Sequence, residues 1–256
     1  MEHCKQHIVE KLINYNIPVM LVGEAGSGKT TILQKCAEKA GVPYSFIAGT
    51  RQTTVSNILG FMSVNGTYVK STFRKAYEEG HYFNIDEIDA MDANCLLLFN
   101  SLENNMIAFP DGYSEPPHEN FRLMATANPM KEHSAYTGRT KLDAASLDRF
   151  DIIDIDRDDS LEISLVGEKI FKKIKLLREC LKHTCSSKEI SMRDAIRLKK
   201  RTELGLSSGF IEKLLEDNGV ALNMYKTELE NDFDVLDIEE AETLKDLWKL
   251  LQTCKA

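Results

Sequence analysis

The 256-residue sequence lacks the features that mark several classes of protein. It has no run of about 18 apolar residues, so no membrane-spanning helix is expected. Its six cysteines form no C-x-x-C pair, a pattern that favours reduced thiols over a disulfide scaffold. The first residues have no basic start followed by an apolar core, so no secretory signal is expected. Together these absences predict a cytoplasmic protein.

An excess of positive charge is also missing. The chain carries 32 Lys and Arg residues against 40 Asp and Glu residues, and its formal net charge is −8 at pH 7. A protein with this charge repels nucleic acid as a whole, so any DNA contact would need a local basic patch. A DNA-directed ATPase of the phage replication or packaging type is therefore an alternative that depends on such a patch.

What the sequence does contain is an alternation of strand-like and helical segments through residue 155. Short apolar runs predict strands, and apolar residues every three or four positions predict helices. Strands are expected at 18–22, 44–48, 82–85, 121–127 and 150–155, and helices at 5–16, 28–40, 71–80 and 90–105. This alternation predicts an α/β fold with a parallel sheet and flanking helices.

The pattern changes after residue 157, where several segments have helical spacing and no strand-like run interrupts them. We therefore expect two domains, an α/β core at 1–156 and a small all-helical domain at 157–256. A helix expected at 238–251 would carry its apolar residues on one stripe, which favours core packing over partner binding.

The segment GEAGSGKT, at 23–30, has the spacing of a phosphate-binding P-loop. Its glycines let the backbone wrap closely around a phosphate, and the helix that follows adds the positive end of its dipole. Lys29 is expected to reach the β- and γ-phosphates, and the Thr30 hydroxyl is expected to bind Mg²⁺. The expected nucleotide-binding residues of this segment are Gly23, Glu24, Ala25, Gly26, Ser27, Gly28, Lys29, Thr30 and Thr31.

Polar residues end two further strand-like runs. YFNIDEID places Asp86 and Glu87 after one apolar strand, and FRLMATANP places Asn128 after another. Asp86 fits a second Mg²⁺ ligand that acts through water, and the adjacent Glu87 suits a general base for the attacking water. The Asn128 amide can hold that water against the γ-phosphate. The structural alternatives are a surface cluster of acids and an Asn-Pro turn without a catalytic role.

Taken together, the motifs resemble those of the AAA+ ATPases, and among them the MoxR and CbbQ/NorQ-like branch. This branch is dynein-related and includes cobaltochelatase small-subunit-like and phage-borne ATPases. The resemblance covers roughly residues 5–200 and rests on GEAGSGKT, GFMSVNGTYVKSTFRKAYEEG, FNIDEIDAMD, MATANP, YTGRTKLDAASLDRF and ISMRDAIR. It implies a P-loop core with a helical lid, assembled into a ring that is usually a hexamer, with ATP bound between subunits.

The resemblance also implies roles for single residues. Lys29 and Thr30 match the Walker A positions, Asp86 and Glu87 match Walker B, and Asn128 matches sensor 1. The implied activity is Mg²⁺-dependent ATP hydrolysis that remodels or activates a partner protein in a chaperone-like manner. In the families that it resembles, that partner often carries a von Willebrand A-type domain.

Arginines complete the implied site. Arg149, in SLDRF, matches the arginine finger that acts in trans on a neighbouring subunit, and Arg139 is a second candidate for that role. A guanidinium suits the charge that spreads over the transferring phosphoryl group, although Arg149 could instead form a surface ion pair. Arg193 matches sensor 2 loosely, because Met192 stands where the family often has a small residue, and Arg197 lies one helical turn along.

Residues 60–71 give the best hairpin signal, because Asn65-Gly66 suits a type I′ turn between short apolar runs. The segment matches a family insertion that points toward the central pore, so Phe61, Tyr68 and the turn are candidates for touching a substrate or partner. A surface hairpin with its aromatic residues packed down is the alternative. A second insertion at 104–121 also resembles a family loop.

Two other activities stay open on the sequence. Residues 140–143 read T-K-L-D and fit a guanine-recognition motif, but the chain has no D-x-x-G, so ATP is preferred over GTP. A scaffold that binds ATP and hardly hydrolyses it is the other alternative. The presence of Glu87 and Arg149 argues against such a scaffold.

Overall fold

The computed structural model describes residues 2–99, 106–129, 148–182 and 190–206 of the chain. Its contacts divide the chain into two compact units, Glu2–Asp156 and Arg157–Ala256. Among the helices of the described part, none has both the length and the apolar character that crossing a membrane requires.

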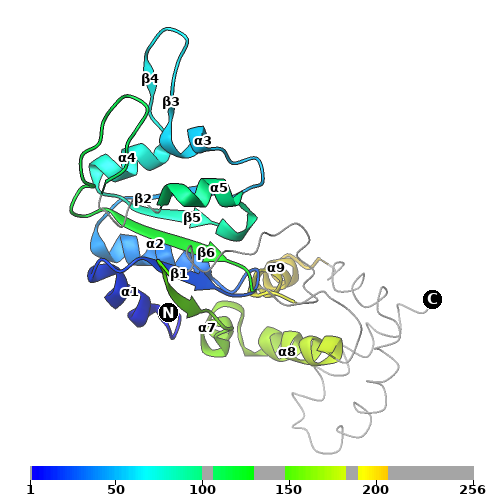
Figure 1. The fold of residues 1–256 in the computed structure, drawn as a ribbon. Helices are drawn as coiled ribbons and strands as arrows, with labels where there is room; N and C mark the ends of the chain where they lie inside the picture. Colours follow the sequence, from blue (N-terminus) through cyan, green and yellow to red (C-terminus); the bar gives the residue numbers. More distant parts are fainter. Residues whose placement is uncertain (1, 100–105, 130–147, 183–189, 207–256) are drawn as a thin grey trace, which may run out of the picture. The chain divides into compact units, whose positions relative to one another are not determined.

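The first unit is built on a five-stranded sheet in the order β2-β5-β6-β1-β7 (Figure 1). The strands are β1 (Val19–Val22), β2 (Tyr44–Ala48), β5 (Tyr82–Asp86), β6 (Arg122–Ala127) and β7 (Asp151–Asp154). Every pairing between them is parallel. The carboxyl ends of β5, β6 and β1 therefore lie side by side, at what we call the carboxyl edge of the sheet.

Helices cover both faces of this sheet (Figure 1). α1 (Gln6–Asn14) and α2 (Lys29–Ala40) form one core with alternate residues of β1, whereas Met20 joins the core that contains α4 (Thr72–Glu79). Successive side chains of a strand point to opposite faces, so a strand that is covered on both faces reads as a continuous apolar run. The predicted α/β fold with a parallel sheet is confirmed.

The segment after β5 differs from the helix expected at 90–105. A 3₁₀ turn, η1 (Ile88–Ala90), comes first, and Met91 is extended before the short helix α5 (Ala93–Leu96). The chain turns at the end of β5, so Ala90 and Met91 belong to this turn and the α-helix begins only at Ala93. Residues 100–105 lie outside the described residues. A further short helix, α3 (Val55–Leu59), begins with a capping box between Thr54 and Asn57.

The expected hairpin is present as β3 (Phe61–Met62) paired antiparallel with β4 (Tyr68–Val69). Its turn is not of type I′, because Gly66 has a φ of 73° while Asn65 is not among the described non-glycine residues with positive φ. The Gly66 N–H donates to the Ser63 carbonyl at 2.9 Å. This pattern fits a type I turn that ends in a left-handed glycine, a conformation that costs Gly little.

The second unit contains the helices α7 (Asp159–Val166), α8 (Glu168–Lys182) and α9 (Met192–Glu203). A buried ion pair ties α8 to α7, because both terminal nitrogens of Arg178 lie 2.7 Å from the carboxylate oxygens of Glu162. The Arg178 Nε also donates to the Ile190 carbonyl at 2.9 Å. A bidentate pair of this kind fixes direction as well as distance. The helix expected at 238–251 lies outside the described residues.

Candidate nucleotide site

The P-loop connects β1 to α2 at the carboxyl edge. Gly28 precedes α2 with a φ of 96°, a conformation that an L side chain rarely adopts. Gly23 is needed for a different reason, since a Cβ at this position would lie 2.3 Å from the Ile155 carbonyl oxygen. The side chain of Ser27 is buried, and its hydroxyl has no hydrogen-bond partner among the described residues. The residues from Gly23 to Gly28 thus form a tight loop, and Lys29, Thr30 and Thr31 are the first residues of α2.

Lys29 is half-buried and is held by neutral oxygen atoms. Its Nζ donates to the carbonyls of Gly23 at 2.7 Å and Glu24 at 3.0 Å, and it lies 3.4 Å from Asn128 Oδ1. Burial lowers the pKa of this ammonium, and four nearby carboxylates, Asp86 first among them, offset the effect only in part. No carboxylate among the described residues forms an ion pair with it. The cation is therefore well suited to an incoming anion such as a phosphate.

Thr30 and Asp86 meet at the carboxyl edge. The Thr30 hydroxyl donates to Asp86 Oδ1 at 3.1 Å, although the two residues are 56 positions apart in the chain. A hydroxyl and a carboxylate are the hard oxygen ligands that Mg²⁺ takes beside substrate phosphates. The donor set of these two residues therefore fits a nucleotide-bound Mg²⁺.

Glu87 follows β5 in an unusual backbone conformation. Its φ is 56° and its ψ is 47°, which is the left-handed region that non-glycine residues seldom enter. Its N–H donates to the Thr126 hydroxyl at 3.0 Å. Backbone conformations of this kind persist only where the surroundings enforce them, and they cluster at functional sites.

Asn128 follows β6 and is 6% exposed. Because β6 lies between β5 and β1, the residues that end these three strands are neighbours. The structure therefore brings together Lys29, Thr30, Asp86 and Asn128, which the sequence could link only through their motifs. What the arrangement can do chemically is bind phosphate and Mg²⁺ and place polar groups around an attacking water.

Arg149 lies at the opposite edge of the same sheet. It precedes β7, whose first residue, Asp151, pairs with Val19 at the start of β1, whereas the P-loop follows the end of β1. The length of β1 separates the two edges by on the order of 10 Å. Around Arg149 is a cavity of about 700 Å³ whose walls include Pro18, Pro116 and Phe121. Arg149 thus lies at the edge of the sheet opposite the P-loop of its own chain.

The other arginines proposed for the site lie either outside the described residues or in the second unit. Arg139 lies outside the described residues. Arg193 is in the first turn of α9 in the second unit. Arg197, one turn further, lies 3.6 Å from Asp194.

Two residues that the sequence did not single out line the same site. The Thr126 hydroxyl donates to Asp86 Oδ1 at 2.5 Å, and Gly49 at the end of β2 donates its N–H to the Asp86 carbonyl at 2.6 Å. Thr126 stands two positions before Asn128 on β6, so the period of a strand was a signal that could have pointed to it. For Gly49 the sequence offered no comparable signal.

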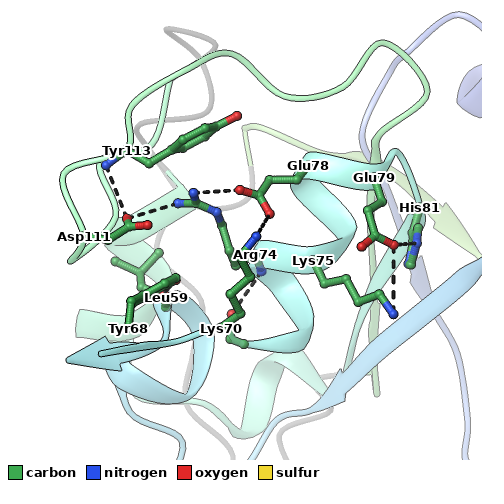
Figure 2. A network of polar contacts seen from close by, with 11 residues as sticks. Leu59, Tyr68, Lys70, Arg74, Lys75, Glu78, Glu79, His81, Asp111 and Tyr113 are labelled. Carbon is green, nitrogen blue, oxygen red and sulfur yellow. Dashed lines mark hydrogen bonds and ion pairs between the residues drawn. The ribbon is translucent and has the colours of Figure 1, made fainter. Parts of the chain in front are cut away.

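The hairpin is anchored on a cluster that surrounds a buried arginine. Figure 2 shows Arg74 of α4 between Glu78 and Asp111, with Tyr68 of β4 beside it. The Tyr68 hydroxyl donates to the Leu59 carbonyl at 2.5 Å, so this ring is packed against the protein. The exposed apolar side chains of the hairpin are those of Phe61, Met62, Val64 and Val69.

The second insertion, described from residue 106 onward, packs on the same arginine. The Arg74 guanidinium carbon lies 3.7 Å from the ring centre of Tyr113 and 4.1 Å from that of Phe109. Asp111 of the same loop lies 3.4 Å from Arg74 Nη1. We call Tyr68, Arg74, Glu78, Phe109, Asp111 and Tyr113 the Arg74 cluster. It joins the two insertions to α4.

The chain is similar to known proteins at the level of a family and of single relatives. The family described as AAA domain (dynein-related subfamily) matches residues 18–150, which is more than half of the chain. Midasin of Giardia intestinalis is 25% identical over 238 residues, and Midasin of Dictyostelium discoideum is 27% identical over 168 residues. The ATP-dependent zinc metalloprotease FtsH of Bacillus subtilis (strain 168) is 29% identical over 240 residues.

These relatives are much longer than the matched segment. The alignments cover 81%, 61% and 87% of this chain but only 5%, 3% and 32% of the respective relatives. The chain therefore spans no more than about a third of any of these three proteins. Their activities as whole proteins do not transfer with the match.

Solved structures share the fold at low sequence identity. A crystal structure from Cytophaga hutchinsonii, provisionally named an ATPase, matches with a TM-score of 0.51 and 16% identity over 98% of this chain and 77% of that one. NtrX from Brucella abortus matches with a TM-score of 0.55 and 13% identity over 77% of this chain and 47% of that one. These likenesses support the fold, and the family match over residues 18–150 shows that the chain belongs to the dynein-related subfamily of AAA domains, within the AAA+ NTPases.

Proposed function

We propose that the protein is a Mg²⁺-dependent ATPase of the MoxR type that works as a ring and remodels or activates a partner protein. The observation that carries this proposal is the meeting of Lys29, Thr30, Asp86 and Asn128 at one edge of the sheet. The family supports a nucleotide as the ligand. Two names among the similar proteins, an ATP-dependent protease and an ATPase, favour ATP over GTP.

The proposed reaction is hydrolysis of the γ-phosphate. Lys29 binds the β- and γ-phosphates, and Thr30 and Asp86 hold Mg²⁺, which when bound neutralises the charge that develops on the phosphate oxygens. Glu87 takes a proton from a water held by Asn128. The water oxygen bonds to the γ-phosphorus, and the bond to the bridging oxygen of ADP breaks. Inorganic phosphate and ADP are the products.

Arg149 is proposed to act on a neighbouring copy. It lies at the edge of the sheet opposite its own P-loop, so a contact with phosphate requires the P-loop of another subunit. A head-to-tail contact of this kind closes into a ring when the rotation allows it. A hexamer is the expected size, and Arg193 of each subunit is proposed to reach the γ-phosphate as sensor 2.

The partner is proposed to be a protein that carries a von Willebrand A-type domain, and the hairpin is proposed to contact it. Support comes from Phe61, Met62, Val64 and Val69, apolar side chains that are exposed on one small hairpin. Proteolysis, which the name of one relative includes, is not proposed. These 256 residues contain no H-E-x-x-H zinc motif.

The proposal is tested by measuring phosphate release from ATP and from GTP with Mg²⁺. Wild-type protein is expected to hydrolyse ATP, and Glu87→Gln is expected to bind ATP and lose turnover by about 100-fold or more. Equal turnover in Glu87→Gln would overturn the catalytic assignment. A preference for GTP would overturn the choice of nucleotide.

The ring is tested by mixing. Arg149→Ala subunits titrated into wild-type protein are expected to lower turnover at wild-type sites, because each finger serves a neighbour. Arg149→Ala subunits mixed with Glu87→Gln subunits are expected to regain turnover, because each supplies what the other lacks, and no regain would contradict action in trans. Native mass measured with and without ATP gives the size of the assembly, and Glu87→Gln protein held with ATP is the bait for the partner.

A further inference from the structure

We propose that Thr126 is the positioning residue of the Asp86–Glu87 pair, an inference that rests on the proposed ATPase function. Thr126 is the fifth residue of β6 and is 1% exposed. Its hydroxyl holds both acidic residues at once. It holds Asp86 through the carboxylate and Glu87 through the backbone.

The contact with Asp86 fixes one carboxylate oxygen. Asp86 Oδ1 accepts from the Thr126 hydroxyl at 2.5 Å and from the Thr30 hydroxyl at 3.1 Å. Two donors from different elements, β6 and α2, leave this oxygen little freedom to rotate. The orientation of the proposed Mg²⁺ ligand is thereby set before any nucleotide binds.

In the contact with Glu87 the same hydroxyl acts as a hydrogen-bond acceptor. A hydroxyl has one hydrogen, which goes to Asp86, and its lone pairs remain free to accept. The Glu87 N–H donates to Thr126 Oγ1 at 3.0 Å, and this bond holds a residue whose φ of 56° is otherwise unfavourable. That backbone conformation sets the direction of the Glu87 Cα–Cβ bond, from which the side chain starts.

The end of β2 supports the same turn from the side away from β6. Gly49 donates its N–H to the Asp86 carbonyl at 2.6 Å, and a Cβ on Gly49 would lie 2.5 Å from the Glu87 carbonyl oxygen. The sheet order places β5 between β2 and β6. The turn after β5 is therefore clamped between two strands, and Thr126 supplies the side-chain part of the clamp.

The parity of the strands explains why Thr126 can reach Asp86. Met124 of β6 and Tyr82 of β5 both belong to the core beneath α1 and α2. Thr126 and Asp86 lie two and four positions further along their strands, so both point to that same face. A residue of the opposite parity, such as Ala125, would face the other core.

The consequence is specific to the chemical step. Misplacing a catalytic group by about 1 Å can cost on the order of 100-fold in rate. Lys29 and the P-loop backbone are proposed to bind the phosphates, whereas the Thr126 hydroxyl bonds Asp86 and Glu87. Loss of the hydroxyl should therefore lower kcat and weaken the Mg²⁺ response while nucleotide affinity in the absence of Mg²⁺ stays close to wild type.

The experiment compares Thr126→Val, which keeps the shape, with Thr126→Ser, which keeps the hydroxyl. The readouts are kcat and KM for ATP, the affinity for a fluorescent ATP analogue in EDTA and in Mg²⁺, and the exchange rate of the Glu87 amide by NMR. Ser45→Ala is the matched control, because it removes a hydroxyl that bonds His81 at 2.7 Å near the other end of the same sheet.

For Thr126→Val we expect kcat to fall by about 10- to 100-fold, KM to change by less than about threefold, and exchange of the Glu87 amide to rise by about tenfold or more. Affinity in EDTA should stay within about twofold, and the gain in affinity on adding Mg²⁺ should shrink. Thr126→Ser and Ser45→Ala should resemble wild type in every readout.

Failures of the two proposals are distinguishable. If wild-type protein shows no ATP turnover, the ATPase proposal is overturned. The exchange rate of the Glu87 amide in Thr126→Val then still shows whether Thr126 positions the turn. If Glu87→Gln abolishes turnover but Thr126→Val leaves it unchanged, only the role proposed for Thr126 is overturned. If Thr126→Val shows no cooperative melting, Thr126→Ala replaces it. A Thr126→Ser variant as impaired as the Val or Ala variant would overturn the role of the hydroxyl.

Discussion

Two cations are sheltered within the same α/β unit, and their surroundings differ in kind. Lys29 is held by two backbone carbonyls and an amide oxygen, all of them uncharged. Arg74 is 2% exposed and has two carboxylates and three aromatic rings around its guanidinium. A buried charge that already has its counter-ions serves the structure, whereas one held only by neutral dipoles is prepared for a charged ligand.

The two cations also belong to two different parts of the unit, the carboxyl edge and the Arg74 cluster. The carboxyl edge is assembled from residues that contact the nucleotide in the proposed reaction. The Arg74 cluster lies around α4 and joins the hairpin to the loop at 106–113 (Figure 2). Replacement by methionine should therefore reduce stability at Arg74 and nucleotide affinity at Lys29.

The largest effect on stability is expected for Arg74→Met. It should lower the free energy of unfolding by about 2–4 kcal/mol, because it leaves Glu78 and Asp111 without their counter-ion. Both carboxylates are partly exposed, so this loss stays below that of a fully buried ion pair. Urea denaturation measures it. Lys75→Met is the control, since Lys75 lies on the surface 3.9 Å from Glu79 and should change stability by less than about 0.5 kcal/mol. If Lys75→Met lowers the free energy of unfolding as much as Arg74→Met does, the buried ion pairs of Arg74 make no special contribution to stability.

Lys29→Met should act on binding and spare stability. Loss of a charged hydrogen bond of about 1.5–3 kcal/mol corresponds to about a 10- to 100-fold weaker affinity for ATP, measured by fluorescence titration. Burial lowers the pKa of Lys29, so at neutral pH the unfolded chain holds this proton more tightly than the folded one. The charged Lys29 is therefore disfavoured by folding, so Lys29→Met should leave the free energy of unfolding unchanged or raise it slightly. A loss of stability as large as that of Arg74→Met would contradict this.

Acid should reduce the difference between wild type and Arg74→Met. Burial acts to raise the pKa of Glu78, but hydrogen bonds and charge from Arg74 and Lys70 outweigh it and lower the pKa below its ordinary 4.5. A lowered carboxyl pKa stabilises the fold above the unfolded value and stops doing so as pH falls through the folded value. Denaturation at pH 7 and below pH 4.5 should therefore give a smaller stability gap at the lower pH. A gap independent of pH would contradict the pairing.

The smallest effect is expected for Tyr68→Phe. It removes the hydroxyl that donates to the Leu59 carbonyl and should cost about 0.5–1.5 kcal/mol. Hydrogen exchange should show faster opening of residues 60–69 with the rest of the sheet unaffected. Tyr15→Phe, at a ring that is 81% exposed, is the control and should change neither quantity. An unchanged hairpin in Tyr68→Phe would mean that the ring alone anchors it.

Much of the fold followed from periodicity. The strands at 19–22, 44–48 and 122–127 lie within a residue of their expected ends, because each is a short run rich in apolar residues. The helix expected at 90–105 was misplaced at its start. Its apolar spacing carried no sign that Glu87 would adopt a left-handed conformation and that a 3₁₀ turn would follow.

The candidate site followed from the sequence only where a motif carries its own mechanism. GEAGSGKT and the acids after YFNI could be read from residue order and from strand ends. Gly49 offered no such signal, and for Thr126 the strand period gave only its face, because their importance lies in a carbonyl and a carboxylate that belong to another strand. The roles assigned to Arg149, Arg193 and the hairpin stay predictions for the experiments above.

By itself, the sequence determined a parallel α/β unit, a phosphate loop with its lysine, and the polar residues that end the neighbouring strands. Local spacing is sufficient for these features, since strand period and loop chemistry are properties of adjacent residues. Only the tertiary structure decided that Thr126 bonds Asp86, that Arg74 is buried among two insertions, and that Arg149 lies at the edge of the sheet opposite its own P-loop. Those outcomes depend on strand order and side-chain direction, which bring together residues that are far apart in the chain.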